Sequence, residues 1–176
     1  YAFEHCEARF ACVGAEQQAQ FAAICPDGLR PMPDDLDLDA QVPLHPLSSG
    51  DDALLMYTSG TTGRSKGAML THRNLVSNAI TLTDYWQFTD QDILLHALPI
   101  YHTHGLFVAS HVATLRGGRM IFLAKFDPDT ICHWLPQATT MMGVPTFYTR
   151  LLATPEFDHA LTAHIRLFIS GSAPLL

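Results

Sequence analysis

Residues 57–67 hold the densest set of groups in the chain that could bind an anion. The stretch reads Tyr-Thr-Ser-Gly-Thr-Thr-Gly-Arg-Ser-Lys-Gly and combines hydroxyl groups with three glycines and two cations. Glycines let the backbone turn tightly so that successive N–H groups converge on one anion, and a lysine adds a point charge. A Walker A loop would need Gly-Lys-Ser/Thr before a helix, whereas here Lys66 precedes Gly67 and an apolar segment. The stretch predicts a phosphate-binding loop, and an ordinary Ser/Thr/Gly surface turn is the alternative.

A second group of chemically useful side chains follows the apolar segment 93–98. His102 and His104 flank Thr103 in an otherwise nearly apolar stretch. A neutral imidazole can donate a hydrogen bond to an anionic oxygen, which suits a site that handles phosphate and carboxylate groups. Two other interpretations stay open. Histidines in apolar surroundings are often core residues, and a His-x-His pair could bind a metal, although no cysteine or carboxylate lies nearby.

These groups need elements that position them, and the pattern from residue 53 onward supplies them. Apolar segments at 53–57, 68–70, 93–98, 120–123, 139–142 and 165–170 predict strands. The first is a continuous apolar run, typical of a strand buried on both faces. Helices are expected from 72, after a possible cap at Thr71, and at 106–115, 127–135 and 146–153; Asp127 followed by Pro128 predicts the start of the third. The alternation predicts an α/β fold with a mostly parallel sheet flanked by helices. Ligands bind at the carboxyl ends of such strands.

Composition limits the classes of protein. Of the 176 residues, 48% are hydrophobic and 15% charged, which predicts a folded chain rather than a disordered one. The net charge of −7 argues against a nucleic-acid partner. The longest stretch without Asp, Glu, Lys or Arg, 93–115, contains histidines, Pro99 and Gly105, so we expect no membrane span. Four cysteines without a CxxC pair favour reduced thiols in the cytoplasm.

The acidic residues gather in the first part of the chain. Residues 1–52 carry ten acidic and two basic side chains, whereas residues 53–176 carry seven and eight. The nearly neutral second part could accept an anionic ligand without opposing a strong field. In the first part, a strand is expected at 8–13 and a helix at 17–25. An acidic, Pro-rich loop is expected to follow from residue 26.

Three stretches, taken in order, resemble the adenylate-forming (ANL) superfamily, which includes acyl-CoA synthetases and the adenylation domains of peptide synthetases. Residues 57–67 are similar to its phosphate loop, Leu-Pro-Ile-Tyr-His-Thr-His-Gly at 98–105 to its aromatic/histidine motif, and Gly-Ser-Ala-Pro-Leu at 171–175 to its adenine-side turn. Within the family, YHTHGLFVA, MIFLAKFDPD and MGVPTFYTRLL are most similar to malonyl-CoA synthetases. The resemblance covers residues 51–176, and residues 1–47 are assigned by position only.

The resemblance implies an AMP-forming acid–thiol ligase that uses ATP, Mg²⁺ and coenzyme A. Such an enzyme joins a small carboxylate, here malonate or methylmalonate, to AMP and then transfers the acyl group to CoA. The residues implied to bind the β- and γ-phosphates are Thr58, Ser59, Gly60, Thr61, Thr62, Gly63 and Lys66. His102 matches the catalytic position beside the α-phosphate. His104, Met142, Gly143 and Val144 would line the acyl pocket, and Gly171, Ser172, Ala173 and Pro174 would lie against adenine.

The resemblance also implies machinery that would follow Leu176: a Tyr-Gly-x-Thr-Glu segment with a magnesium-binding glutamate, a ribose-binding aspartate, and a small domain with a catalytic lysine. We therefore expect residues 1–47 to end a preceding α/β subdomain and residues 48–176 to form the central portion of a truncated ATP/acyl-binding subdomain. On its own the chain is expected to be inactive. The alternatives are another adenylate-forming enzyme such as a fatty-acyl or aryl-CoA ligase, a P-loop-like phosphohydrolase, and a non-catalytic nucleotide-binding fragment.

Overall fold

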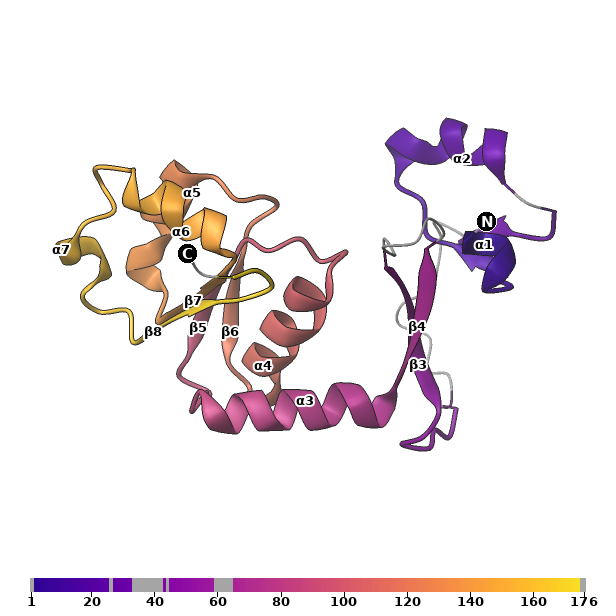
Figure 1. The fold of residues 1–176 in the computed structure, drawn as a ribbon, viewed down its shortest axis with the longest axis horizontal. Coiled ribbons are helices and arrows are strands. Elements are labelled where there is room, and N and C mark those ends of the chain that lie inside the picture. The colour runs from indigo at the N-terminus through magenta and orange to yellow at the C-terminus, as the bar shows by residue number, and fades with distance from the viewer. Residues whose placement is uncertain (1, 26, 33–42, 44, 59–64, 175–176) are drawn as a thin grey trace. The chain divides into compact units, whose positions relative to one another are not determined.

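A computed structural model describes residues 2–25, 27–32, 43, 45–58 and 65–174 (Figure 1). The chain divides into two compact units, Tyr1–His72 and Arg73–Leu176. Each unit is described by itself below. Within the described residues, no helix has both the length and the apolar character needed to cross a membrane.

A four-stranded parallel sheet forms the centre of the second unit. Its strands lie in the order β6-β5-β7-β8, and every neighbouring pair is parallel. Their bounds are β5 Ile93–His96, β6 Arg119–Phe122, β7 Thr140–Gly143 and β8 Leu167–Ser170. In the register of the sheet, His96 at the end of β5 lies between Phe122 and Met142. The mostly parallel sheet predicted from the alternating pattern is confirmed.

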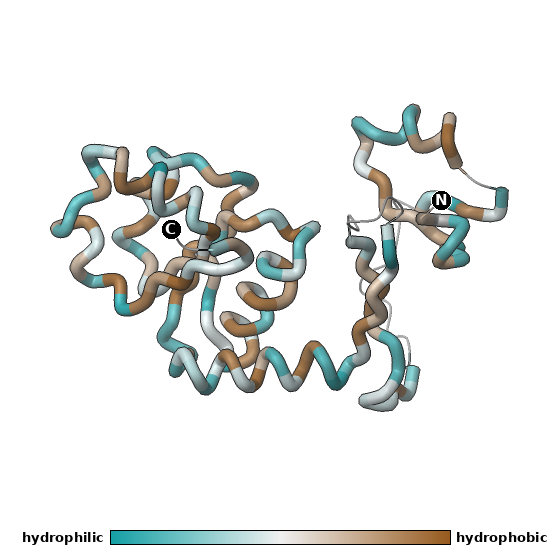
Figure 2. Tube along the Cα trace, in the orientation of Figure 1, coloured by the Kyte–Doolittle hydropathy of each residue, from teal (hydrophilic) through white to brown (hydrophobic). Residues whose placement is uncertain are grey.

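Helices cover both faces of this sheet because adjacent strand residues point to opposite sides. Leu94 and Met142 belong to a core that also contains residues of α4, whereas Leu95 and Met141 pack in a second core with residues of α5 and α6. The helices of this part of the chain are α3 His72–Tyr85, α4 Ser110–Leu115, α5 Pro128–Trp134, α6 Pro145–Leu152 and α7 His159–Thr162. Hydrophobic and hydrophilic residues alternate along α3, as expected of an amphipathic helix (Figure 2).

Two helix boundaries follow local sequence signals, and one does not. The side chain of Asp127 accepts a hydrogen bond from the Thr130 N–H at the start of α5, as predicted, and a 3₁₀ turn at Leu135–Gln137 ends this helix around Pro136. Gly117, with φ of 75°, follows the end of α4. The segment expected as one helix over 106–115 differs, because it opens with a π-helical turn, η2 His104–Ala109. This turn lies immediately after the strand-end loop of β5.

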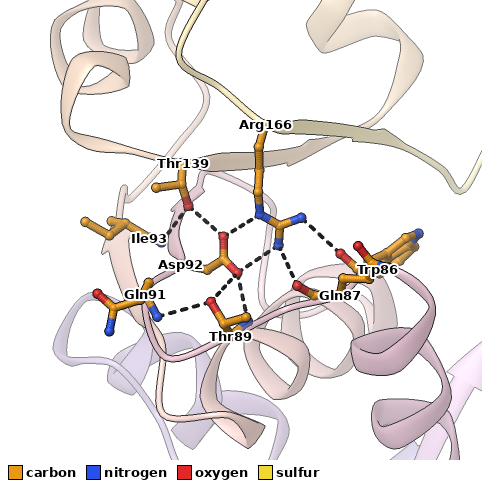
Figure 3. A network of polar contacts seen from close by, with 8 residues as sticks. All are labelled: Trp86, Gln87, Thr89, Gln91, Asp92, Ile93, Thr139 and Arg166. Carbon is orange, nitrogen blue, oxygen red and sulfur yellow. Dashed lines mark hydrogen bonds and ion pairs between the residues drawn. The ribbon is translucent and has the colours of Figure 1, made fainter.

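An ion pair between a buried carboxylate and a partly exposed arginine holds the amino ends of three strands together (Figure 3). Asp92 precedes β5 and is 3% exposed, and Arg166, just before β8, binds both of its oxygens at 2.7 and 2.8 Å. The hydroxyl of Thr139, just before β7, donates to Asp92 Oδ1 at 2.9 Å and accepts from the Ile93 N–H. Burial alone would raise the pKa of Asp92, but its bonds to Arg166, the Thr89 N–H and Thr139 lower the pKa from 3.8 to about 2. The carboxylate is therefore charged and held at neutral pH.

An antiparallel hairpin is the main feature of the first unit. Its strands are β3 Asp52–Thr58 and β4 Lys66–Thr71, and Thr58 pairs with Lys66 where the two strands meet the connecting loop. The expectation of a strand at 53–57 is confirmed, but its burial on both faces is wrong, since Leu54 to Tyr57 are only half-buried. A connection this short cannot join parallel strands, and an antiparallel pair can leave one face exposed.

Among the described residues, the remainder of the first unit forms a small core. Ala11, Phe21 and Leu29 are its buried hydrophobic residues. The elements are α1 Ala2–His5, β1 Phe10–Ala11, η1 Ala15–Gln17, α2 Gln18–Ile24 and β2 Arg30–Pro31, and β1 and β2 pair in parallel. The strand expected at 8–13 and the helix expected at 17–25 are confirmed with narrower bounds. Residues 26, 33–42 and 44 of the predicted acidic loop lie outside the described residues.

Candidate functional site

A cleft opens at the carboxyl ends of the parallel strands in the second unit. Its volume is about 340 Å³, and it is lined by residues that follow β5, β7 and β8, among them His102, His104, Val144 and Ser172. A neighbouring cleft of about 210 Å³ shares Thr103, His104 and Ser172 with it and is completed by residues such as Trp86 and Gly171. The sheet thus gathers the histidine motif and the 171–174 turn, which lie far apart in the sequence, at the edge where such folds bind ligands.

His104 lies between the two clefts and is held by a turn from another strand. The residue is 8% exposed, and its Nδ1 lies 2.9 Å from the Ser172 hydroxyl. Burial lowers the pKa of His104, and the nearby His96 lowers it further. The ring is therefore neutral at physiological pH. When the Ser172 hydroxyl donates to Nδ1, the proton of the neutral ring resides on Nε2, and the ring offers a hydrogen-bond donor.

The turn after β8 has a backbone that lets His104 approach it closely. A Cβ atom on Gly171 would lie 3.3 Å from Cε1 of His104, closer than ordinary packing allows. The Gly171 N–H donates to the Gly143 carbonyl at 3.1 Å, so the pairing of β7 and β8 continues to the edge of the cleft. Ser172 then takes a left-handed conformation with φ of 67°, which a serine adopts at some cost in free energy. This strain is a local sign of a functional turn.

His102 is exposed at the rim of the cleft, in contrast to the buried His104. Its ring lies 4.6 Å, centroid to centroid, from that of Tyr101, which is itself 74% exposed. The imidazole can therefore reach a ligand in the cleft from the solvent side. In the part of the chain that the structure describes, no three His, Cys, Asp or Glu residues gather in a way that could hold a metal ion. The two histidines of the motif thus have different surroundings.

The structure places the remaining predicted residues in several environments. Val144 lines the larger cleft, whereas Met142 is fully buried in the core and lines neither cleft, and Gly143 lies against the rings of Phe147 and Tyr148. Ala173 and Pro174 are exposed. In the first unit, Thr58 and the exposed Lys66 end the two strands of the hairpin, and the Thr58 hydroxyl lies 3.4 Å from the Lys66 carbonyl. The other predicted phosphate-binding residues, 59–63, lie outside the described residues.

One residue beneath the site was not singled out from the sequence. His96, the last residue of β5, is fully buried, and its Nε2 lies 2.9 Å from the carbonyl oxygen of Gly105. The Ser110 hydroxyl donates to the same carbonyl at 2.9 Å. A histidine inside an otherwise apolar strand was the available signal, because a buried ring nitrogen needs a partner.

Comparison with known proteins identifies the class to which this fold and cleft belong. Residues 2–176 match the family described as AMP-binding enzyme. The chain therefore belongs to the AMP-binding enzyme family. Within that family its relatives include malonyl-CoA ligases and other acyl-CoA ligases.

Individual relatives support this placement. The chain is 38% identical over 139 residues to the mitochondrial malonate–CoA ligase ACSF3 of Xenopus laevis, covering 70% of this chain and 24% of that protein. It is 36% identical over 139 residues to a feruloyl-CoA synthase of an Amycolatopsis species, covering 78% and 28%. The chain thus spans about a quarter of the length of these curated relatives.

Solved structures agree with the fold over the whole chain. The ATP-bound MatB of Rhodopseudomonas palustris is 46% identical with a TM-score of 0.87, covering 100% of this chain and 37% of that one. A malonyl-CoA ligase in a ternary product complex with methylmalonyl-CoA and AMP is 35% identical with a TM-score of 0.84, covering 99% and 38%. These similarities also confirm the α/β fold class.

Proposed function

We propose that the chain is part of an ATP-dependent acid–thiol ligase that adenylates a small dicarboxylate, malonate or methylmalonate, and transfers the acyl group to coenzyme A. Its relatives include a malonate–CoA ligase and a ligase with bound methylmalonyl-CoA and AMP. The observation that carries the choice of substrate is the buried His104 between the clefts, anchored by Ser172. The proposal includes the expectation that residues 1–176 alone catalyse neither half of the reaction.

His104 supports a dicarboxylate because a buried donor needs an acceptor. A neutral imidazole that accepts from Ser172 at Nδ1 presents Nε2–H as a donor, and the second carboxylate of malonate is an acceptor. A purely apolar acyl chain would leave this donor without a partner at a cost of about 1–3 kcal/mol. The pocket is therefore expected to favour malonate over acetate.

The proposed reaction has two steps. A carboxylate oxygen of the substrate attacks the α-phosphorus of ATP, a new O–P bond forms, and the bond to pyrophosphate breaks. The sulfur of CoA then attacks the acyl carbon of the mixed anhydride, and AMP leaves with the original carboxylate oxygen. In this scheme His102, exposed at the cleft rim, donates to an α-phosphate oxygen. The substrate lies beside His104, where the buried ring excludes water on one side.

The hairpin of the first unit supplies the proposed phosphate loop. Thr58 and Lys66 pair at the ends of the two strands, and residues 59–65 lie between them in the sequence. Their hydroxyl and backbone N–H groups, with Lys66, would bind the β- and γ-phosphates and stabilise the leaving pyrophosphate. Residues 171–174 would lie against adenine, and Val144 against the acyl group.

Magnesium would neutralise phosphate charge in such a reaction. Among the described residues, no three His, Cys, Asp or Glu side chains gather in a way that could hold a metal ion, and magnesium bound to substrate phosphates needs only one or two protein carboxylates. No step above passes through the metal.

An aryl-CoA ligase is the second candidate, favoured by the 36% identity to a feruloyl-CoA synthase. An extended aryl acid has no second carboxylate near the reacting one, so it would leave the Nε2–H of His104 without an acceptor. A site that hydrogen-bonds its substrate can discriminate against an analogue without the acceptor by a factor of up to about 10⁴. Substrate preference therefore separates the two candidates.

The test is a substrate panel with the product of the complete reading frame that contains residues 1–176. Malonate, methylmalonate, acetate and ferulate are each incubated with ATP and CoA, and thioester and AMP are quantified. The proposal expects one AMP per thioester and a kcat/KM for malonate or methylmalonate at least tenfold above that for acetate or ferulate. A preference for ferulate would establish the second candidate, and ATP hydrolysis that does not depend on any acid would contradict both.

A further inference from the structure

His96 shows a feature that core packing does not explain. It occupies the last position of β5, with no exposed surface, between Phe122 of β6 and Met142 of β7. Its ring lies 4.8 Å, centroid to centroid, from that of Phe122. An aliphatic residue such as Leu94 or Leu95, its neighbours in the strand, would fill this space without burying polar atoms. A histidine here has a cost, because its Nδ1 has no partner among the described residues.

The other ring nitrogen explains the histidine. Nε2 lies 2.9 Å from the carbonyl oxygen of Gly105, in the first turn of the π-helical segment. A carbonyl oxygen only accepts, so Nε2 carries the proton and the buried ring is the neutral Nε2–H tautomer. Burial agrees with this state, since it lowers the pKa of His96 more than the bond to Gly105 raises it. The last residue of β5 is thereby hydrogen-bonded to the backbone of the π-helical turn that carries His104.

Further contacts, besides the hydrogen bond from His96, hold this turn in place. A Cβ atom on Gly105 would lie 2.3 Å from the carbonyl oxygen of Pro99, so this turn packs directly against the strand-end loop. The Ser110 hydroxyl, five residues further along, donates to the same Gly105 carbonyl at 2.9 Å. Two side chains therefore orient one peptide group, next to the peptide of His104. Wide π-helical turns of this kind are frequent at functional sites.

We infer that His96 is a positioning residue: its Nε2–H anchors the Gly105 carbonyl and so fixes where the His104 ring meets the substrate. The ring of His104 is then held at two points, by His96 through the backbone and by Ser172 through Nδ1. This inference rests on the proposed function, because it gives His104 a task at the substrate. It adds a residue that touches no ligand and lies beneath the cleft.

Replacing His96 with glutamine or with asparagine tests the inference, because the two amide side chains have similar polarity but differ in length. Glutamine places its amide nitrogen at about the position of Nε2, whereas asparagine reaches only as far as Nδ1. We expect H96Q to keep kcat/KM for malonate within threefold of the wild type and H96N to lower it at least thirtyfold. The KM for ATP should change less than threefold in both variants. The matched control is H159N, on the exposed first residue of α7, which should stay within twofold of the wild type.

The assay uses the product of the complete reading frame with malonate, ATP and CoA, and equal losses in H96Q and H96N, or no loss in either, would overturn the inference. A second measurement does not depend on activity. Long-range ¹H–¹⁵N NMR of the wild-type chain reports the tautomer of each histidine, and the H96Q spectrum identifies the His96 signal. An Nε2–H tautomer is expected, and an Nδ1–H tautomer refutes the anchor. Wild-type protein without thioester formation would instead overturn the proposed function, while the tautomer still decides whether the anchor exists.

Discussion

Replacing Asp92 with asparagine should remove most of the stabilisation that the ion pair with Arg166 gives to the sheet. The substitution keeps the size of the side chain but removes the charge that faces Arg166. It also turns one of the two acceptor oxygens into an NH2 donor, so the side chain can no longer accept from both Thr139 and the Thr89 N–H. The pKa of Asp92 is lowered from 3.8 to about 2. At neutral pH this shift corresponds to about 2 kcal/mol of free energy of unfolding. Asp92 is buried, but the side chain of Arg166 is 37% exposed, so solvent screens part of this attraction and about 2 kcal/mol is an upper value.

The pH dependence of the stability lost in D92N follows from the direction in which the pKa of Asp92 is shifted. The pKa is lower in the folded chain than in the unfolded chain, so the contribution is fully present above about pH 4 and is lost as the pH falls toward 2. The difference in stability between the wild type and D92N should be up to about 2 kcal/mol at pH 7 and about half of its pH 7 value near pH 3. D84N is the matched control, because the pair of Asp84 with Arg116 is 57% and 53% exposed and should contribute less than about 1 kcal/mol.

Urea unfolding followed by tryptophan fluorescence measures this difference. Both tryptophans of the chain, Trp86 and Trp134, lie in the second unit, and the Trp86 carbonyl itself accepts from Arg166 at 3.0 Å. The signal therefore reports on the sheet that Asp92 holds. Equal losses in D92N and D84N would refute the reasoning, as would a D92N difference that stays constant from pH 7 to pH 3.

Three further predictions concern the proposed reaction. In the product of the complete reading frame, Lys66→Ala should lower kcat/KM for ATP ten- to a hundredfold, because a charge-assisted bond contributes about 1.5–3 kcal/mol. The control is K125A, at the only other lysine of the 176 residues, which should have little effect. An unchanged kcat/KM in K66A would show that Lys66 does not bind the phosphates. His104→Phe should reduce the preference for malonate over acetate at least tenfold, and a preserved preference would show that this ring does not read the second carboxylate. The 176-residue chain alone should show no ATP–pyrophosphate exchange, and detectable exchange would show that no further machinery is needed.

The alternating pattern predicted the parallel sheet because each strand and helix there carries its own local signal. The hydrophobic runs around Leu94 and Met141 and the cap at Asp127 were all visible in the sequence. The order of the strands in the sheet was not visible in the sequence, because it depends on contacts such as that between Asp92 and Arg166, which lie 74 residues apart. The antiparallel pairing of the first hairpin was missed although the shortness of its loop excludes a parallel crossover.

The residues that line the candidate site were predicted from their motifs, whereas the contacts that hold them in place were not. His104 and Ser172 were singled out separately, and only the fold shows that the two side chains contact each other. The π-helical turn left no periodic signal, because its apolar residues also fit an ordinary helix. The role of His96 depends on one carbonyl oxygen, that of Gly105, and backbone groups carry no sequence signature.

The fate of a carboxylate oxygen tests the central claim most directly. Malonate labelled with ¹⁸O in its carboxylates is converted to the thioester by the product of the complete reading frame, and the nucleotide product is examined by mass spectrometry. Attack of the carboxylate on the α-phosphorus predicts AMP that carries one ¹⁸O for each thioester formed. Formation of ADP, or of AMP without the label, would contradict the claim that this protein forms an acyl-adenylate.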